Sequence, residues 1–480
     1  MKTWCLLLLL GLTSFAFAAP EAEAPIGMPG MQSHRIKEPV FDGHAYVYEA
    51  GKEHTQTVLL VHGLGDNGAR DYSNQIPWLA RSYHVLAVDL PGFAQSDKNS
   101  TAYSPTTYTT FLKFVADRFA RKPFTLVGHS MGGVVVLRYA ATHPDDLKRL
   151  VVVDAPGLLH RAAYTGEFLT HIGLGLLQSR TENTPAAGLL GEDSVGMVTE
   201  RLNQILGRVE QTNIDPQMIL SIPALRQKLL QNDPMRIAGL AVAMEDMSSD
   251  IPKIKTETLV IWGKRDRIAP PRTGRLLAHV MPRARLAEID RAGHVPMEDT
   301  PDQFRDVLEP FLERGLAPVL ARVRERTRRG DVICAGKSRV VYEGAFDTLT
   351  LNRCNKVVIS NATVRELRVH DSSVRIEDSD IGGDRGGLYA SNATIEMTNG
   401  RIEGPVAMTL VASRLDLAGV QVEGRRSAVE GRDVVPVVVE GKKSGPATVS
   451  SIVFSISRVR SPHTDAEMHS YYSVVNGKPL

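Results

Sequence analysis

The stretch FTLVGHSMGG, residues 124–133, decides the fold of the larger part of this chain. Its first four residues favour a buried strand, and the apolar run VVVLRYAA at 134–141 is typical of a buried helix. The Gly-x-Ser-x-Gly between them predicts a sharp strand-to-helix turn. Gly128 and Gly132 let neighbouring backbone approach closely, and the strained turn holds the Ser130 hydroxyl at the end of a sheet. The pattern predicts a nucleophile elbow.

The bulk composition describes an ordinary globular protein of more than one domain. The chain has 480 residues, 43% of them hydrophobic and 23% charged, with a formal net charge of +2. A chain of this length exceeds the usual size of a single core. The small net charge gives no reason to expect nucleic acid or an anionic surface as a partner.

The N-terminus carries the pattern of a secretory signal peptide, which we expect at residues 1–18. Lys2 precedes a short apolar run at 5–12, and Ala16 and Ala18 offer small residues around a cleavage point. The run is shorter than the roughly 20 residues that span a bilayer, and no later stretch reads as a membrane span. We expect an exported protein, periplasmic or secreted.

Short apolar runs recur along the first part of the chain, at residues 57–61, 84–88, 124–127, 150–153 and 258–262. Runs of this kind, separated by helical stretches, predict a doubly wound, mostly parallel α/β sheet covered on both faces. We assign it to a domain at 41–312. Within it, residues 156–250 lack strand patterns and show helical spacing, which predicts a helical cap over the site.

After residue 330 the pattern changes to short Val- and Ile-rich strands with Asn, Asp, Ser and Gly at the corners. Copies recur with a period near twenty, as in IEM at 395–397 and LDL at 415–417. This predicts an all-β, β-solenoid-like domain at 331–460, with an antiparallel sandwich as the competing fold. Residues 313–330 read as a basic linker or helix, and 461–480 as a polar tail.

The corners and the cysteines fit a coiled stack of strands. Asn361 and Asn392 match a glycosylation pattern, but their recurrence in register favours a role as corner residues in left-handed conformation. Cleavage of the signal leaves Cys334 and Cys354, twenty residues apart, so one coil period would bring them together. We expect a disulfide in an oxidising compartment; two unpaired thiols are the alternative.

A serine hydroxyl needs a base and a group that orients the base. His294 follows Gly293 after a strand-like run, and a loop histidine in that setting is hard to explain by core packing. Asp266 lies just past the strand at 258–262 and is the expected acid. Asp154, past the strand at 150–153, is the alternative acid.

The oxyanion that forms on a substrate carbonyl needs two preorganised donors. The residue after the nucleophile, Met131, offers one backbone N–H group. The loop after an early strand offers the other at Leu64. His62 and His129 are then expected as neighbours of the site without an acid–base role.

In combination these segments resemble the α/β-hydrolase family. The motifs of this family occur in the expected order, at residues 62–65, 89–97, 128–133, 263–266 and 293–294. The resemblance covers about residues 41–312 and implies Ser130 as nucleophile, Asp266 as acid, His294 as base, and Leu64 and Met131 as oxyanion donors. Relatives that dehalogenate or open epoxides carry Asp at the elbow, so Ser130 argues against both.

The resemblance implies a serine hydrolase that cleaves carboxylic esters, with a small-molecule or lipid ester as substrate and with no cofactor or metal. The signal pattern adds that this hydrolase is exported. The same triad serves amidases, peptidases and acyltransferases, which remain alternatives. A non-catalytic protein that binds the cell envelope is the alternative from another class. Beside a catalytic core, we expect the C-terminal domain to act as a targeting or assembly module that contacts a cell-envelope polymer or a protein.

Overall fold

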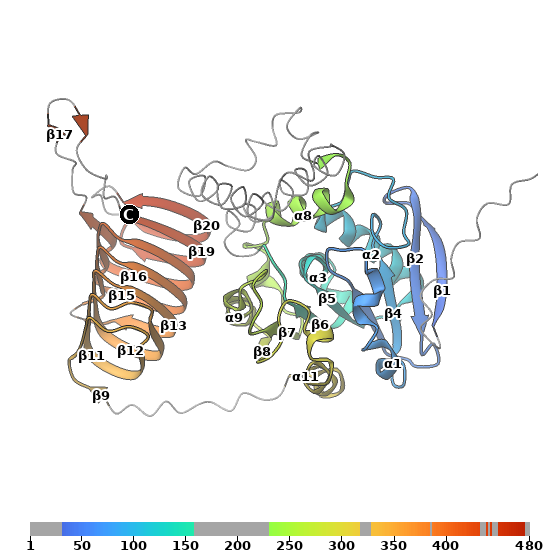
Figure 1. The fold of residues 1–480 in the computed structure, drawn as a ribbon, viewed down its shortest axis with the longest axis horizontal. Coiled ribbons are helices and arrows are strands. Elements are labelled where there is room, and N and C mark those ends of the chain that lie inside the picture. Colours follow the sequence, from blue (N-terminus) through green and yellow to red (C-terminus); the bar gives the residue numbers. More distant parts are fainter. Residues whose placement is uncertain are drawn as a thin grey trace, which may run out of the picture.

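The structure, a computed structural model, describes residues 31–157, 230–316, 328–384, 386–432, 438–439, 442–443 and 450–475. It has an α/β domain and, beside it, a domain of stacked strands (Figure 1). The predicted signal peptide at 1–18 and most of the predicted cap lie outside the described residues. No helix in the described ranges combines the length and apolarity needed to cross a bilayer.

The first domain contains an eight-stranded sheet in the order β1-β2-β4-β3-β5-β6-β7-β8. Its strands are β1 (Gln32–Glu38), β2 (Gly43–Ala50), β3 (Thr57–Val61), β4 (His84–Asp89), β5 (Phe124–His129), β6 (Leu147–Val153), β7 (Thr258–Gly263) and β8 (Ala284–Ile289). From β4 to β8 neighbouring strands are parallel, whereas β1–β2 and β2–β4 are antiparallel. The predicted mostly parallel sheet is confirmed, and β1 adds an edge strand that begins before residue 41.

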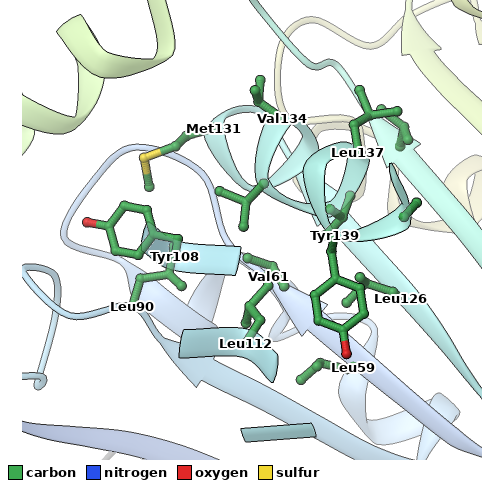
Figure 2. Close-up of a cluster of buried hydrophobic side chains, with 14 of the residues drawn as sticks. Leu59, Val61, Leu90, Tyr108, Leu112, Leu126, Met131, Val134, Leu137 and Tyr139 are labelled. Carbon is green, nitrogen blue, oxygen red and sulfur yellow. The ribbon is translucent and has the colours of Figure 1, made fainter. Parts of the chain in front are cut away.

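Helices lie on both faces of the sheet. They are η1 (Gly68–Tyr72), α1 (Ile76–Leu79), α2 (Pro105–Phe119), α3 (Met131–Thr142), η2 (Pro144–Asp146), α8 (Pro234–Met244), η4 (Ile251–Lys253), α9 (Pro271–Val280), α10 (Pro296–Asp299) and α11 (Pro301–Arg314). Side chains of β3 alternate between two cores: Leu59 and Val61 belong to one, Val58 and Leu60 to the other. Figure 2 shows the first core, where β3 and β5 pack against α2 and α3.

Helix α8 lies within the range predicted as a cap. Gly157, just after β6, contacts this helix: a Cβ on Gly157 would lie 3.0 Å from the carbonyl oxygen of Val242. The chain therefore leaves the sheet after β6 at a point beside α8.

The second domain is all-β, and most of its strands stack in parallel. They are β9 (Arg328–Arg329), β10 (Val332–Ala335), β11 (Val341–Asn352), β12 (Val357–His370), β13 (Ser373–Gly382), β14 (Leu388–Ser391), β15 (Thr394–Val411), β16 (Arg414–Arg432), β17 (Val438–Val439), β18 (Lys442–Lys443), β19 (Ser450–Ser461) and β20 (Thr464–Val475). Val374 pairs with Ile395, and Ile395 with Leu415, as the repeat predicts. The expected stacked strands are confirmed, and the competing antiparallel sandwich is wrong.

Residues in left-handed conformation form the corners of the stack. Asn361, Asp378, Asn392 and Asn399 have φ between 46° and 61°. Asn and Asp tolerate this conformation better than most residues, because their short side chains bond the local backbone. The structure thus supports the corner role predicted for Asn361 and Asn392.

The end of the chain differs from the prediction of a polar tail at 461–480. Strand β20 falls in that range and pairs antiparallel with β19. Ala466 lies opposite Val459, and Met468 packs against the core of the stack. The strand was missed because Asp465 and Glu467 alternate with these residues; Asp465 forms ion pairs with arginines of β19.

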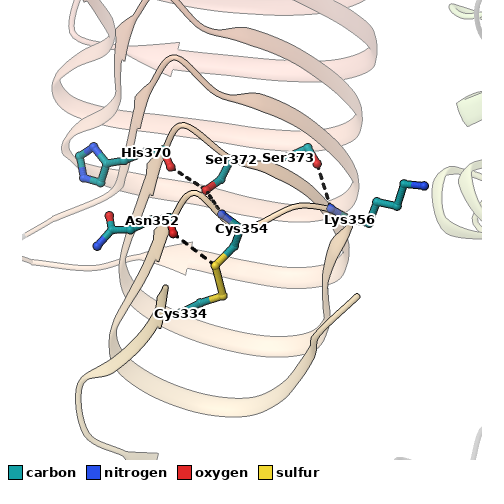
Figure 3. Close-up of a disulfide and its surroundings, with 7 residues drawn as sticks. All are labelled: Cys334, Asn352, Cys354, Lys356, His370, Ser372 and Ser373. Atoms are coloured by element: carbon teal, nitrogen blue, oxygen red, sulfur yellow. Dashed lines mark hydrogen bonds between the residues drawn. A yellow bond between two sulfur atoms is a disulfide. The ribbon is translucent and has the colours of Figure 1, made fainter. Parts of the chain in front are cut away.

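A disulfide joins Cys334 to Cys354, with 6.5 Å between their Cα atoms (Figure 3). The expected pairing is confirmed, although the two are not partners in the strand ladder. Cys334 pairs there with Leu351, and Cys354 lies just past the end of β11. Its backbone N–H donates to Ser372 Oγ at 2.8 Å. The bond thus ties the first coil to the second.

Replacing Cys354 by Ser is expected to destabilise the stacked-strand domain by about 3 kcal/mol, because the bond closes a loop of twenty residues. Urea unfolding, followed by the exchange of amide hydrogens in β10 and β11, measures this. Cys334→Ser should give the same loss, and the double variant no more than either single variant. Additive losses would mean that the thiols are not bonded to each other.

Candidate active site

Ser130 lies between β5 and α3 in a backbone conformation that L-residues rarely adopt. Its φ is 51° and its ψ is −121°. The backbone N–H of Ser130 donates to the carbonyl of Val153 at the end of β6, 2.9 Å away. The side chain is thereby held at the carboxyl edge of the sheet, where parallel α/β folds collect functional groups.

Two glycines make this turn sterically feasible. A Cβ on Gly128 would lie 2.3 Å from the carbonyl oxygen of Gly132. A Cβ on Gly132 would lie 2.4 Å from the carbonyl oxygen of His62. No side chain fits in either place, so the elbow packs directly against the loop that follows β3.

His294 lies between Ser130 and Asp266. Its Nδ1 is 2.8 Å from Asp266 Oδ2, and its Nε2 is 2.9 Å from Ser130 Oγ. A carboxylate can only accept, so Nδ1 carries the proton and Nε2 accepts from the serine hydroxyl. The structure therefore brings the predicted nucleophile, base and acid into one hydrogen-bonded line.

Asp266 is held as a carboxylate. Its Oδ1 accepts from the backbone N–H groups of Ile268 and Ala269, at 2.8 and 3.0 Å. Burial by itself would raise the pKa of Asp266, but the hydrogen bond and charge of His294 and these further hydrogen bonds hold the pKa below its ordinary value. The negative charge thus stays beside the imidazole.

Asp154, the alternative acid, lies beside Asp266 at the end of β6 and is completely buried. Its Oδ1 accepts from the Gly263 N–H at 3.0 Å. Its Oδ2 has no N–H or hydroxyl partner among the described residues, and the group that it meets is the Asp266 carboxylate. Burial first, then the hydrogen bond and charge of Asp266, raise the pKa of Asp154 well above 3.8. Of the two carboxyl groups, Asp154 is therefore the one for which the protonated form is favoured.

Replacing Asp154 by Asn is expected to stabilise the protein at neutral pH. The folded state holds a proton that the unfolded chain releases above about pH 4, so the stability of the wild type falls as pH rises from there to the raised pKa of Asp154. The Asn side chain offers one oxygen acceptor and an N–H donor, as a protonated carboxyl group does, but it does not titrate. The advantage of the variant should grow by up to about 1.4 kcal/mol per pH unit, in urea unfolding from pH 5 to 8.

The matched Asp154→Ala variant leaves the Gly263 N–H group without its acceptor, and we expect it to lose about 1–3 kcal/mol at every pH. If Asp154→Asn is instead destabilised increasingly as pH rises, Asp154 is ionised in the fold and the assignment of its proton is wrong.

The two predicted oxyanion donors belong to segments that meet at the serine. Met131 is the first residue of α3, and N–H groups in the first turn of a helix have no intrahelical acceptor. The loop carrying Leu64 is pressed against the elbow, since a Cβ on Gly63 would lie 3.1 Å from Ser130 Cβ. The positive end of the α3 dipole points to the same place.

His129 and Asp71 support this arrangement. His129 Nε2 donates to the backbone carbonyl of His294 at 2.7 Å, which fixes the loop of the base against the elbow. Asp71 Oδ2 accepts from the Gly63 N–H at 3.2 Å and lies 3.8 Å from His129 Nδ1. Burial alone would raise the pKa of Asp71, but His129 and the other partners hold the pKa below its ordinary value. His129 lies near the site, as the sequence predicts, whereas Asp71 belongs to no motif and could not be predicted from the sequence.

The described residues contain one group with the spacing of metal ligands, made of Asp154, Asp266 and His294. Its atoms lie within 4.8 Å of one another. Nδ1 of His294 donates to Asp266, and the raised pKa of Asp154 favours the protonated form of that carboxyl group. Ligand atoms must be deprotonated, so this group in this state does not favour a cation.

The comparisons with known proteins concern the first domain. The family described as alpha/beta hydrolase fold matches residues 56–301. Lipase 1 of Psychrobacter immobilis is 28% identical over 277 residues, which are 56% of this chain and 81% of that protein. A 2-hydroxy-6-oxo-6-phenylhexa-2,4-dienoate hydrolase of Comamonas testosteroni is 27% identical over 280 residues, 55% of this chain and 90% of that protein.

Two solved structures are similar to part of this chain. An esterase from Exiguobacterium antarcticum is 21% identical, with a TM-score of 0.45, and the match covers 59% of this chain and 100% of that one. A lipase structure described as putative, from Acinetobacter baumannii AYE, is 21% identical with a TM-score of 0.43 and covers 60% of this chain and 92% of that one.

Proposed function

The chain belongs to the alpha/beta hydrolase family, and from this membership we propose that it hydrolyses carboxylic esters through Ser130, His294 and Asp266. The observation that carries the proposal is the position of His294, hydrogen-bonded to Ser130 Oγ on one side and to Asp266 on the other. This is the arrangement that activates a serine for attack on a carbonyl.

In the proposed reaction Ser130 Oγ attacks the ester carbonyl while His294 Nε2 takes its proton. The negative charge of Asp266 stabilises the imidazolium and keeps the ring oriented. The imidazolium then protonates the departing alcohol, which leaves an acyl group on Ser130. Water, deprotonated by His294, releases the acid and restores the serine.

Leu64 and Met131 are proposed to donate their N–H groups to the oxyanion formed in both steps. Support comes from the packing of the Gly63 loop against Ser130 and from the position of Met131 at the N-terminus of α3. Preorganised backbone donors of this kind stabilise the transition state more than the ground state.

The relatives named as lipases favour an acyl ester as substrate. A peptidase that acts on a free N-terminus needs an acidic group to hold the amine, and Glu245 with Asp246 is an acidic pair of that kind. Glu245 instead accepts from Arg138 Nε at 2.8 Å. This engagement favours an esterase over an aminopeptidase.

The test is covalent labelling of the full-length protein by a fluorophosphonate, with the label located by peptide mapping. We expect the label on Ser130, together with hydrolysis of p-nitrophenyl esters that shows an optimum of acyl chain length. Matched p-nitroanilides separate an amidase from an esterase. A folded protein that takes no label would exclude a serine hydrolase and favour the non-catalytic alternative.

Export is part of the proposal. The signal pattern at residues 1–18 supports it, and the Cys334–Cys354 disulfide fits an oxidising compartment. N-terminal sequencing of the protein from a fractionated host should begin just after Ala18 or Ala19. An intact Met1 in the cytoplasmic fraction would contradict export.

Contact of the stacked strands with an envelope polymer or protein stays a prediction, for which retention on envelope fractions is the measurement.

A further inference from the structure

The loop that carries Asp266 leads directly into helix α9. The two N–H groups that hold the Asp266 carboxylate belong to Ile268 and Ala269, and α9 begins at Pro271. The carbonyl of Ala269 accepts from Trp262 Nε1 at 2.8 Å, and this indole is fully buried. Any displacement of α9 is therefore passed to the acid over a very short length of chain.

The side of α9 that faces away from the sheet is docked on the stacked-strand domain. Arg272 is only 7% exposed. Its guanidinium donates to Thr398 Oγ1 at 2.6 Å, to the Met397 carbonyl at 2.9 Å and to both carboxylate oxygens of Asp416, at 2.8 and 3.1 Å. A buried guanidinium is tolerated only when it is paired in this way, so the contact holds α9 against the stack.

A second arginine of α9 joins three elements. Arg275 Nε donates to Glu288 of β8 at 2.9 Å, and a terminal nitrogen donates to Glu377 of β13 at 2.6 Å. The Arg275 carbonyl accepts from Asn399 Nδ2 at 3.3 Å. The strand before the His294 loop is thereby linked to the same face of the stack.

Helix α9 packs against a row of corner residues of the stack. Asp378, Asn399, Gly419 and Ile456 stand at corresponding places in successive coils, with φ between 45° and 66°. Gly419 leaves room for Leu276, since a Cβ there would lie 2.7 Å from Leu276 Cδ1. Leu276 and Ala418 are both fully buried in this contact. Figure 1 shows α9 on the side of the α/β domain that faces the stack.

We propose that the stacked-strand domain positions the catalytic acid: by holding α9 through Arg272 and Asp416, it keeps Asp266 in line with His294. Arg272 is a positioning residue, since it touches no reacting atom. This inference rests on the proposed function, and it assigns the second domain a part in turnover on soluble substrates.

The experiment compares Arg272→Ala, Asp416→Asn and Arg272→Lys in the full-length protein. Asp416→Asn keeps the volume of the side chain and removes its charge, so the contact can still be tested if Arg272→Ala does not fold. We expect kcat on a soluble p-nitrophenyl ester to fall by about 10- to 100-fold for Arg272→Ala, with KM changed less than about twofold, because the acid is displaced while the substrate pocket is not. Arg272→Lys should recover part of kcat.

Arg365→Ala is the matched control, because Arg365 forms an exposed ion pair with Asp347 elsewhere in the same domain. It should leave kcat unchanged. The low-field proton resonance of His294 Nδ1–H reports on the bond to Asp266 without any substrate. It should shift or vanish in Arg272→Ala and stay unchanged in Arg365→Ala.

Unchanged kcat and an unchanged resonance in a folded Arg272→Ala protein would overturn the inference and leave the second domain without a part in the reaction. Failure of the proposed function looks different: the wild type itself would take no fluorophosphonate label on Ser130. The resonance still tests the positioning of Asp266 in that case.

Discussion

Replacing Ser130 by Ala is expected to lower kcat on p-nitrophenyl esters by about 10⁵- to 10⁶-fold and to abolish fluorophosphonate labelling. The hydroxyl is the atom that attacks, and no other nucleophile lies within hydrogen-bond distance of His294 Nε2 among the described residues. KM should change little, because the methyl side chain leaves the pocket as it was. Retention of more than about one hundredth of kcat would place the nucleophile elsewhere.

Ser130→Gly is the matched variant that separates chemistry from backbone strain. At φ 51° and ψ −121° an L-residue is strained by about 1–3 kcal/mol, which glycine avoids. We expect the glycine variant to be as inactive as the alanine variant but more stable by about 1 kcal/mol in urea unfolding, after the greater freedom of glycine in the unfolded chain is subtracted. A less stable glycine variant would show that the surrounding structure does not strain this residue.

Asp266→Asn is expected to lower kcat by about 10⁴-fold while the fold is kept. The amide oxygen can still accept from Ile268 and Ala269, so the loop is preserved. The amide nitrogen, however, would donate to His294 Nδ1, and the ring proton would move to Nε2. His294 could then no longer accept the proton of Ser130. Steady-state kinetics near neutral pH measure the loss.

Asp290→Asn is the control for this substitution, since Asp290 is exposed and paired with Lys264 at the surface. It should leave kcat unchanged. A large loss in Asp154→Asn together with a small one in Asp266→Asn would make Asp154 the catalytic acid, as the alternative interpretation of the sequence holds.

The elbow and the two loops after later strands could be predicted because strand ends in a parallel sheet meet at one edge. Ser130, Asp266 and His294 each follow an apolar run, and local sequence reveals such runs. The choice between Asp266 and Asp154 could not be made in this way. Both follow strands. They differ in that Asp266 faces His294, whereas burial raises the pKa of Asp154.

The docking of the two domains could not be predicted from local patterns either. Arg272 reads as an ordinary surface residue of a helix, and its burial depends on Asp416, which is far away in the sequence. The stack itself was predictable because its coils repeat. Strand β20 was not, because its charged side chains gain their partners only when β19 lies beside it.

The contact between Gly157 and Val242 has a consequence for how such a protein diversifies. Gly157 follows β6 and touches α8 at Val242, so these two points of the chain are neighbours although a long stretch of sequence separates them. A segment inserted between neighbouring points can change in length with only a slow, logarithmic change in loop-closure entropy. We therefore expect the stretch of sequence between these two points to vary in length among relatives without disturbing the sheet or the loops that carry Ser130, Asp266 and His294.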